Sequence, residues 1–378
     1  MRITVEKEWD HISQRRYRCI HETTLEKTST LVDKTFPVWY NEEDRQHRKE
    51  TKLMCTCITY ENGDFYFGRN LDLEYSFGEC VVVTPRNYPL SFKKMETSDS
   101  HYAVIGMASV MGGYPMYAEA VNEKGLGIAG LNFPGNACYP KESAKRYQST
   151  PYELIPWILG RCASVAEAEE LLKETDLLGI PFAPDVPLAP LHFMIADRER
   201  VLVAEPVADG LKLYENPFGV LTNNPPFPFH LMNMQQYLNL TAKVPENRFA
   251  ESMGLKPFGQ GMGGIGLPGD ASPASRFVRA AFLKWNSRAP KEEKPSVSQF
   301  FHILDYVGMV RGMVLTEEGR EDITTYSCCV NTRTGVYYYK TYDNHRIQAV
   351  ALGNENPEGN TLVTYPLAKE EEIRFLNA

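Results

Sequence analysis

Three residues of this chain have the types and spacing that could produce an activated cysteine nucleophile. Cys55 follows Met54, and methionine aminopeptidase removes Met before small residues, so initiation at Met54 would place Cys55 at the N-terminus. The free α-amino group, whose pKa is ordinarily about 7.7 to 8.0, could then act as general base for its own thiol. Arg69 would favour the thiolate, and Asp72 could hold the amino group by a hydrogen bond.

A hairpin is needed to bring these residues together, since each has an ordinary structural explanation when taken alone. A buried strand cysteine explains Cys55, and an ion pair at a strand end explains the arginine and the aspartate. Residues 55–60 and 65–70 are both rich in β-forming types, and the dipeptide Asn62-Gly63 joins them. That pattern predicts two antiparallel strands with a tight turn, which returns Arg69 and Asp72 to Cys55.

The composition is typical of a soluble, globular protein. The chain has 378 residues, 43% of them hydrophobic, and 40 basic against 48 acidic residues give a net charge of −8. The sequence contains no basic block of the kind that would predict a nucleic acid or an anionic membrane surface as partner. No apolar run approaches the roughly 18 residues of a membrane span. Eight cysteines in a long chain without a secretory signal indicate a reducing cytoplasm, not a disulfide scaffold.

Residues 1–54 differ in amino-acid composition from the rest of the chain and are expected to be absent from the mature enzyme. They contain 11 Lys/Arg and 10 Asp/Glu, and their longest apolar stretch, residues 36–40, is too short for a signal peptide, which needs about 7 to 15. Two explanations stay open: a propeptide cut before Cys55, or a start assigned upstream of a true start at Met54. The run Arg48-Lys49-Glu50 favours the second, because a purine-rich ribosome-binding site could encode it. Residues 55–378 are expected to form one domain.

Strands, then helices, then strands again follow along that domain. Strand-like segments cover residues 79–84, 102–106 and 125–131, and later 192–196, 201–204 and 336–340. Between and after them, capping boxes at Thr150-Pro151-x-Glu153 and Ser164-x-x-Glu167 predict two helix starts, and residues 274–285 and 297–304 also have helical patterns. Without regular βαβ alternation, this order predicts an α+β fold of antiparallel sheets covered by helices.

Several motifs, in order from Met54 nearly to the C-terminus, resemble those of the choloylglycine hydrolases, the family that contains bile salt hydrolases and penicillin V acylases. They are Met54-Cys55-Thr56, Phe67-Gly68-Arg69-Asn70-Leu71-Asp72, Thr84-Pro85-Arg86, Asn122-Glu123-x-Gly125-Leu126, Gly130-Leu131-Asn132-Phe133-Pro134-Gly135, Leu221-Thr222-Asn223-x-Pro225, Gly266-x-Pro268-Gly269-Asp270 and Ser275-Arg276-Phe277-Val278-Arg279.

This resemblance implies the αββα sandwich of the N-terminal nucleophile hydrolases, with Cys55 as nucleophile and base. It implies that Arg69 and Asp72 lie beside the cysteine, that Asn132 and Asn223 lie at the oxyanion position, and that a further polar contact comes from Arg276. Without it, both asparagines would be interpreted as turn residues. The resemblance also implies a homotetramer and a reaction that needs no metal or organic cofactor.

The substrate must be inferred from the pocket, because both branches of the family share the catalytic set. Asn132 is the type that bile salt hydrolases carry at its position, where several penicillin acylases carry Tyr. Four further residues fall where the family lines an apolar pocket suited to a steroid, although each is equally plausible as core: Leu71, Tyr75, Phe77 and Met111. A conjugated bile salt is therefore the expected substrate. The alternatives are a penicillin V acylase or related N-acyl amidase, and a silent steroid-binding protein if the extension is retained.

Three other patterns carry less weight. The glycines of Gly259-x-Gly261-x-x-Gly264 match a dinucleotide fingerprint but lack a preceding strand and a following helix, so a loop is expected. Cys55, Cys57 and Cys80 lack a further paired motif that would complete a metal site. A papain-like pair of Cys55 with His192 or His230 lacks a recognisable local signature.

Overall fold

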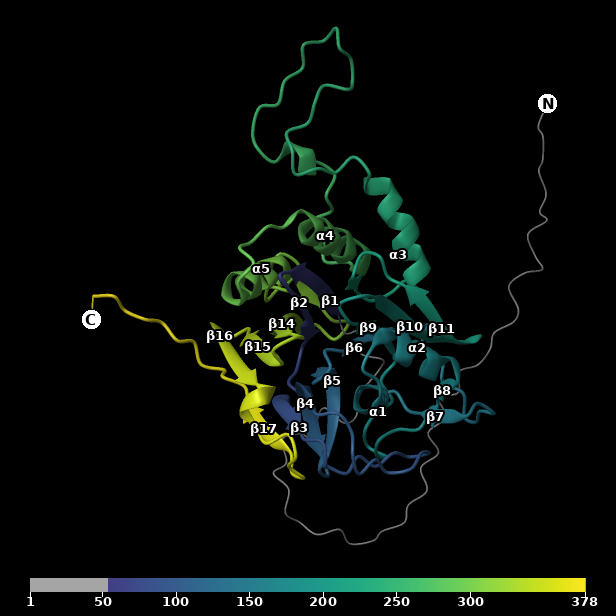
Figure 1. Ribbon diagram of the computed structural model, residues 1–378. Coiled ribbons are helices and arrows are strands. Elements are labelled where there is room, and N and C mark those ends of the chain that lie inside the picture. Colours follow the sequence, from purple (N-terminus) through teal and green to yellow (C-terminus); the bar gives the residue numbers. More distant parts are fainter. Residues whose placement is uncertain (1–53, 378) are drawn as a thin grey trace, which may run out of the picture. The chain divides into compact units, whose positions relative to one another are not determined.

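The computed structural model describes residues 54–377, so the expectations about residues 1–53 lie outside the described part of the chain. Within that part, two large antiparallel sheets pack face to face and helices cover their outer faces (Figure 1). This arrangement confirms the predicted αββα sandwich and the α+β class. None of the helices within residues 54–377 is long and apolar enough to cross a bilayer.

The predicted hairpin lies in the middle of the first sheet. Strand β1 (Met54–Asn62) pairs antiparallel with β2 (Asp64–Leu73), and Gly63 makes the turn with φ of 77°, a conformation that glycine adopts without steric cost. The register sets Cys55 opposite Leu71 and Cys57 opposite Arg69. Since opposite residues of a pair point to the same face, Cys55 and Arg69 both face the second sheet.

Each sheet is antiparallel throughout. The first has the order β12 (Val220–Leu221), β1, β2, β14 (Glu321–Asn331), β15 (Val336–Thr341) and β16 (Asn344–Ala351), with β13 (Val314–Leu315) paired to β14. The second has the order β11 (Gly210–Glu215), β10 (Val201–Val207), β9 (Leu191–Ala196), β6 (Gly127–Asn132), β5 (Tyr114–Asn122), β4 (Val104–Met111), β3 (Cys80–Thr84) and β17 (Val363–Pro366). A short parallel pair, β7 (Tyr147–Ser149) with β8 (Thr175–Leu177), stands apart. The predicted strands are confirmed, and the strands that the pattern missed include β5, β11, β14, β16 and β17.

Two helix layers complete the sandwich. On the first sheet, α4 (Pro273–Asn286) and α5 (Glu293–Asp305) join the core that includes β1 and β2. On the second, α1 (Leu154–Arg161) and α2 (Val165–Lys173) pack against the other face, so that Val82 contributes to this outer cluster while Val81 and Val83 point inward. Helix α3 (Phe227–Met234) follows β12.

Of the two predicted capping boxes, one is correct. Ser164 caps α2 by accepting a hydrogen bond from Glu167 N at 3.3 Å. The prediction at Thr150 was wrong, because residues 151–153 form a turn and α1 begins only at Leu154. The Glu153 carboxylate accepts a hydrogen bond from Lys93 N at 2.6 Å, so it binds the backbone of a loop that is distant in the sequence and does not cap the helix.

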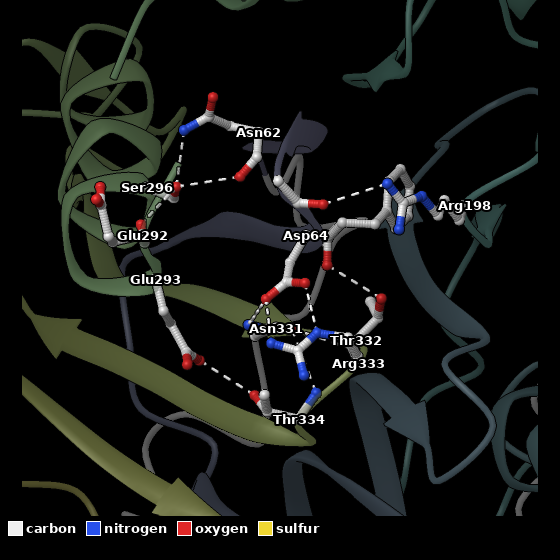
Figure 2. A network of polar contacts seen from close by, with 12 residues as sticks. Asn62, Asp64, Arg198, Glu292, Glu293, Ser296, Asn331, Thr332, Arg333 and Thr334 are labelled. Carbon is white, nitrogen blue, oxygen red and sulfur yellow. Dashed lines mark hydrogen bonds and ion pairs between the residues drawn. The ribbon is translucent and has the colours of Figure 1, made fainter. Parts of the chain in front are cut away.

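A polar network fixes the turn end of the hairpin, far along the strands from Cys55 (Figure 2). Asn62 donates to Ser296 Oγ of α5 at 2.8 Å. Asp64 accepts from Asn331 Nδ2 at 2.9 Å and from Arg333 Nη2 at 2.8 Å, both at the β14–β15 turn. The hairpin is thereby tied to a helix and to a neighbouring turn, which holds the register of the strand that carries Cys55.

Candidate active site

Cys55 is almost fully enclosed, with 3% of its surface exposed. Its backbone nitrogen donates a hydrogen bond to Asn223 Oδ1 at 2.9 Å. In this chain the nitrogen belongs to the Met54–Cys55 peptide bond, and it stands in for the α-amino nitrogen that would exist after residues 1–54 were removed. Burial raises the pKa of the Cys55 thiol, and the positive charge of Arg69 opposes this. A resting thiol is therefore the favoured form.

Asn223 connects three parts of the site. It follows β12, which pairs with β1, so its position is fixed by the same sheet that carries Cys55. Its Oδ1 accepts from Cys55 N and from Arg276 Nη2, the latter at 2.8 Å, while its Nδ2 donates to Asn132 O at 2.8 Å. The backbone of Asn132 also forms a hydrogen bond that lowers the pKa of the Cys55 thiol. Both asparagines named from the sequence thus lie at Cys55.

Arg276 reaches the same place from α4. Ser272 caps that helix, accepting from Ser275 N, which places Arg276 in the first turn and directs it at β1. The fully buried guanidinium donates to the backbone oxygen of Cys55, to Thr56 Oγ1 at 2.7 Å and to Asn223 Oδ1 at 2.8 Å. It therefore fixes the backbone of Cys55 and the Asn223 side chain relative to each other.

Arg69 crosses the space between the two sheets. From β2 its Nη1 donates to Gly130 O of β6 at 2.5 Å, and the same atom lies 3.9 Å from Glu119 Oε2 of β5. Its Nη2 has no hydrogen-bond partner within residues 54–377, although it is buried. A buried donor on a cation next to Cys55 is suited to stabilise negative charge on the sulfur.

Asp72 is enclosed near the same cluster. Its Oδ1 accepts from Thr324 Oγ1 at 2.6 Å, and burial raises the pKa of its carboxyl to about 6 against the opposing charge of Arg276. Asp322, also buried, lies close enough to interact with it, and burial together with the charge of Asp72 raises its pKa to about 7. The hydrogen bond from Cys55 N goes to Asn223, and Asp72 pairs with Met54 in the strand register.

The geometry brings Cys55, two asparagines and two arginines to one place from five separate segments. The model of one family, the linear amide C–N hydrolases of the choloylglycine hydrolase type, matches residues 55–365. The chain belongs to the choloylglycine hydrolase family. It is accordingly an enzyme that hydrolyses linear amide C–N bonds.

Known relatives of this choloylglycine hydrolase align with nearly all of residues 54–377. A bile salt hydrolase/transferase of Lactiplantibacillus plantarum is 48% identical over 86% of this chain and 100% of the relative. A bile salt hydrolase/transferase of Clostridium perfringens is 40% identical, with coverage of 86% and 100%. A solved conjugated bile acid hydrolase from Clostridium perfringens superposes with a TM-score of 0.79 at 39% identity over 85% and 100% of the two chains. A penicillin V acylase from Agrobacterium tumefaciens, 17% identical over 84% and 92%, shares the fold with a TM-score of 0.65.

The four apolar residues expected to line the pocket of this choloylglycine hydrolase occupy two regions of the chain. Leu71 is buried on β2 directly opposite Cys55. Tyr75 and Phe77 are partly buried in the loop after β2 and pack against the core between the sheets. Met111 ends β4 and is partly exposed at the β4–β5 turn. Leu71 is therefore the one of the four whose proximity to Cys55 is given by the strand register.

In this enzyme, the two histidines considered as papain-like bases, His192 and His230, stabilise the loop that carries Asn223. His230 Nε2 lies 3.1 Å from Asn223 O, its ring stacks on Phe277, and burial lowers its pKa to about 4. His192 lies between Glu205, at 3.1 Å, and Thr222 O, at 2.9 Å. Both rings contact the Thr222–Asn223 backbone, which is a supporting role that no local sequence signature could have shown.

Proposed function

We propose that this enzyme hydrolyses the amide bond between glycine or taurine and a bile acid, with Cys55 as nucleophile. One observation carries the proposal: the enclosed Cys55, its nitrogen and the Asn223 side chain form a hydrogen-bonded unit that Arg276 holds. Relatives that share 48% and 40% of its residues over their whole length are named bile salt hydrolases. At 17% identity, the penicillin V acylase supports the fold alone.

The first half of the reaction forms a thioester. The α-amino group of Cys55 takes the thiol proton, and the sulfur attacks the carbonyl carbon of the substrate amide. Negative charge develops on the carbonyl oxygen, where the second N–H of Asn223 Nδ2 and a donor of Asn132 would stabilise it. The C–N bond then breaks as the ammonium group returns its proton to the leaving nitrogen, which departs as glycine or taurine. No metal or organic cofactor takes part.

The second half of the reaction releases the bile acid. Water attacks the thioester carbonyl, the same α-amino group accepts its proton, and the C–S bond breaks to restore the thiol. An amine in place of water would give a new amide, in keeping with the word transferase in the relatives' names. This transfer reaction is tested by adding a free amino acid to the assay and measuring the amide formed between it and the bile acid.

Maturation before Cys55 is part of the proposal. While Met54 remains attached, the nitrogen of Cys55 is an amide whose lone pair is delocalised into the carbonyl and cannot accept a proton. The nitrogen is also directed at Asn223 inside the enclosed site. The domain of the mature enzyme is accordingly proposed to begin at residue 55.

The test compares the full chain with a protein that begins at Met54. Each N-terminus is confirmed by mass spectrometry, and hydrolysis of glycocholate, taurocholate and penicillin V is measured side by side. Activity is expected only where Cys55 is the first residue, with the bile salts preferred over penicillin V. Full activity in protein that retains residues 1–54 would refute the mechanism. Steroid binding without turnover at a verified Cys55 N-terminus would favour a silent binding protein.

We also propose a homo-oligomer, a tetramer by the family resemblance, in the cytoplasm. The segment between α3 and α4 projects from the sandwich (Figure 1) and bears large apolar side chains in solvent, among them Leu238, Phe249 and Phe258 at 88%, 82% and 91% exposure. Such a surface is typical of a protein contact. Native mass spectrometry measures the state directly, and the double variant Phe249→Glu, Phe258→Glu should yield smaller species. A monomeric parent protein would contradict the proposal.

A further inference from the structure

A buried carboxylate, that of Glu119, lies near Arg69 and has no role in the proposed mechanism. Glu119 of β5 is 0% exposed and sits 3.9 Å from Arg69 Nη1. Its Oε2 accepts from Tyr326 OH at 2.7 Å, and its Oε1 accepts from Tyr337 OH at 2.6 Å and Cys328 Sγ at 3.5 Å. Both tyrosines belong to the first sheet, so the network joins the two sheets beside the site.

The surroundings of Glu119 favour its ionised form. Its neighbours are three donors and one cation, and the two hydroxyl contacts have the 2.5 to 2.7 Å lengths typical of hydrogen bonds to a charged oxygen. Burial raises the pKa of the Glu119 carboxyl, while Arg69 and the two tyrosines oppose this. An uncharged Glu119 carboxyl would remove a compensating charge from the buried Arg69 guanidinium, which is unfavourable.

Arg69 therefore lies close to both the Glu119 carboxylate and the Cys55 thiol. Its Nη1 is held at Gly130 O and near Glu119, while its buried Nη2 keeps an unused donor. With Met54 attached, the charged and titratable groups that act on the Cys55 thiol are Arg69 and Asp72 of β2 and Arg276 of α4, and Cys57 of β1 also interacts with it. In protein that begins at Cys55, the free α-amino group joins them, equally in parent and variants. The charge of Glu119 acts on the Cys55 thiol through its effect on Arg69.

We propose that Glu119 is a positioning residue of the reaction. With Tyr326 and Tyr337 it holds the Arg69 guanidinium between the sheets and balances its charge, so that Cys55 stays a neutral thiol until negative charge develops at the bound substrate. This inference rests on the proposed function, since it assumes that Cys55 is the nucleophile. Arg69 then stabilises the negative charge that develops during the reaction. In the resting enzyme, Glu119 compensates the positive charge of Arg69.

The test is the pH dependence of Cys55 alkylation by iodoacetamide, in protein that begins at Cys55, with the labelled peptide quantified by mass spectrometry. Glu119→Gln keeps the size of the side chain but removes its charge. The alkylation midpoint should fall by roughly 0.5 to 1 pH unit, a three- to tenfold faster reaction below both midpoints, since a nearby charge shifts a pKa by about that much or more. Glu119→Asp, which keeps the charge, should restore the parent midpoint.

Matched controls separate this role from stability alone. Glu153→Gln removes another buried carboxylate, at the start of α1 in the outer layer, and should leave the midpoint unchanged. If Glu119→Gln does not fold, the double variant Arg69→Met, Glu119→Gln removes both charges and leaves none unpaired. Its midpoint should equal that of Arg69→Met alone.

An unchanged or raised midpoint in Glu119→Gln would overturn the inference, as would a difference between the double variant and Arg69→Met. Neither result would affect the proposed function. That proposal fails on a different measurement, which is substantial bile salt turnover by a protein that lacks the Cys55 thiol.

Discussion

Replacing Asn223 by alanine should slow the chemical step much more than it weakens binding. The side chain makes three buried hydrogen bonds, accepting from Cys55 N and Arg276 Nη2 and donating to Asn132 O. Loss of an oxyanion donor costs about 2.7 to 4 kcal/mol in the transition state, which is a 10²- to 10³-fold fall in kcat. Loss of the acceptor leaves an arginine N–H unpaired, at a further cost of about 1 to 3 kcal/mol in folding stability.

The assay is steady-state hydrolysis of glycocholate by protein that begins at Cys55, with kcat and KM determined separately and folding verified by thermal unfolding. Asn224→Ala is the matched control, because the neighbouring asparagine also donates to a loop carbonyl, Pro134 O at 2.7 Å, but is only partly buried. Its kcat should stay within about threefold of the parent. Asn223→Asp keeps the acceptors but removes the donor, and should lose most of the rate.

Two results would refute this reasoning. If Asn223→Ala raises KM with kcat unchanged, the residue binds substrate uniformly and does not stabilise the transition state. If Asn223→Asp is as active as the parent, the donor at Nδ2 is not needed.

Other variants test other parts of the site. Cys55→Ala should abolish bile salt hydrolysis in a folded protein, whereas Cys57→Ala should retain it unless packing fails; measurable turnover by the first would contradict the mechanism. Asp322→Asn tests the buried carboxyl pair. Since the pKa of Asp322 is raised from 3.8 to about 7, its contribution to stability is full below about pH 4 and is lost as the pH rises through 7. The melting temperature of Asp322→Asn relative to the parent should therefore increase from pH 4 to 7, by the equivalent of at most about 4 kcal/mol. A constant difference across that range would show that Asp322 does not titrate as inferred.

Local patterns predicted the elements of this fold better than the contacts between them. The β-forming residue types and the Asn62-Gly63 turn predicted the hairpin, whose register sets Arg69 near Cys55. The strand β5 was missed, since Tyr114–Asn122 contains a proline and only a partial alternation of buried side chains. Glu119 lies on that strand, so the buried carboxylate behind Arg69 was missed with it.

Partners distant in the sequence could not be derived from local chemistry. Cys55 and Arg276 are separated by 221 positions, and only the packing of α4 on the first sheet brings them together. The family resemblance named Asn223 and Arg276, but not that one oxygen atom accepts from both Arg276 and the nitrogen of Cys55. Likewise, His192 and His230 looked like possible bases, and only their hydrogen bonds to main-chain oxygens identify them as supports.

The two ends of the domain offer very different sites for attachment. The nitrogen of Cys55 is enclosed and directed at Asn223, whereas residues 373–377 are all exposed and extend away from the sandwich, beyond the contacts that residues 370–372 make with β16 (Figure 1). In the proposed mature enzyme, an affinity tag, fluorophore or surface linker joined ahead of Cys55 would occupy the proposed reaction centre. Joined after residue 377, the same group would leave the catalyst accessible, which favours immobilisation through the C-terminus.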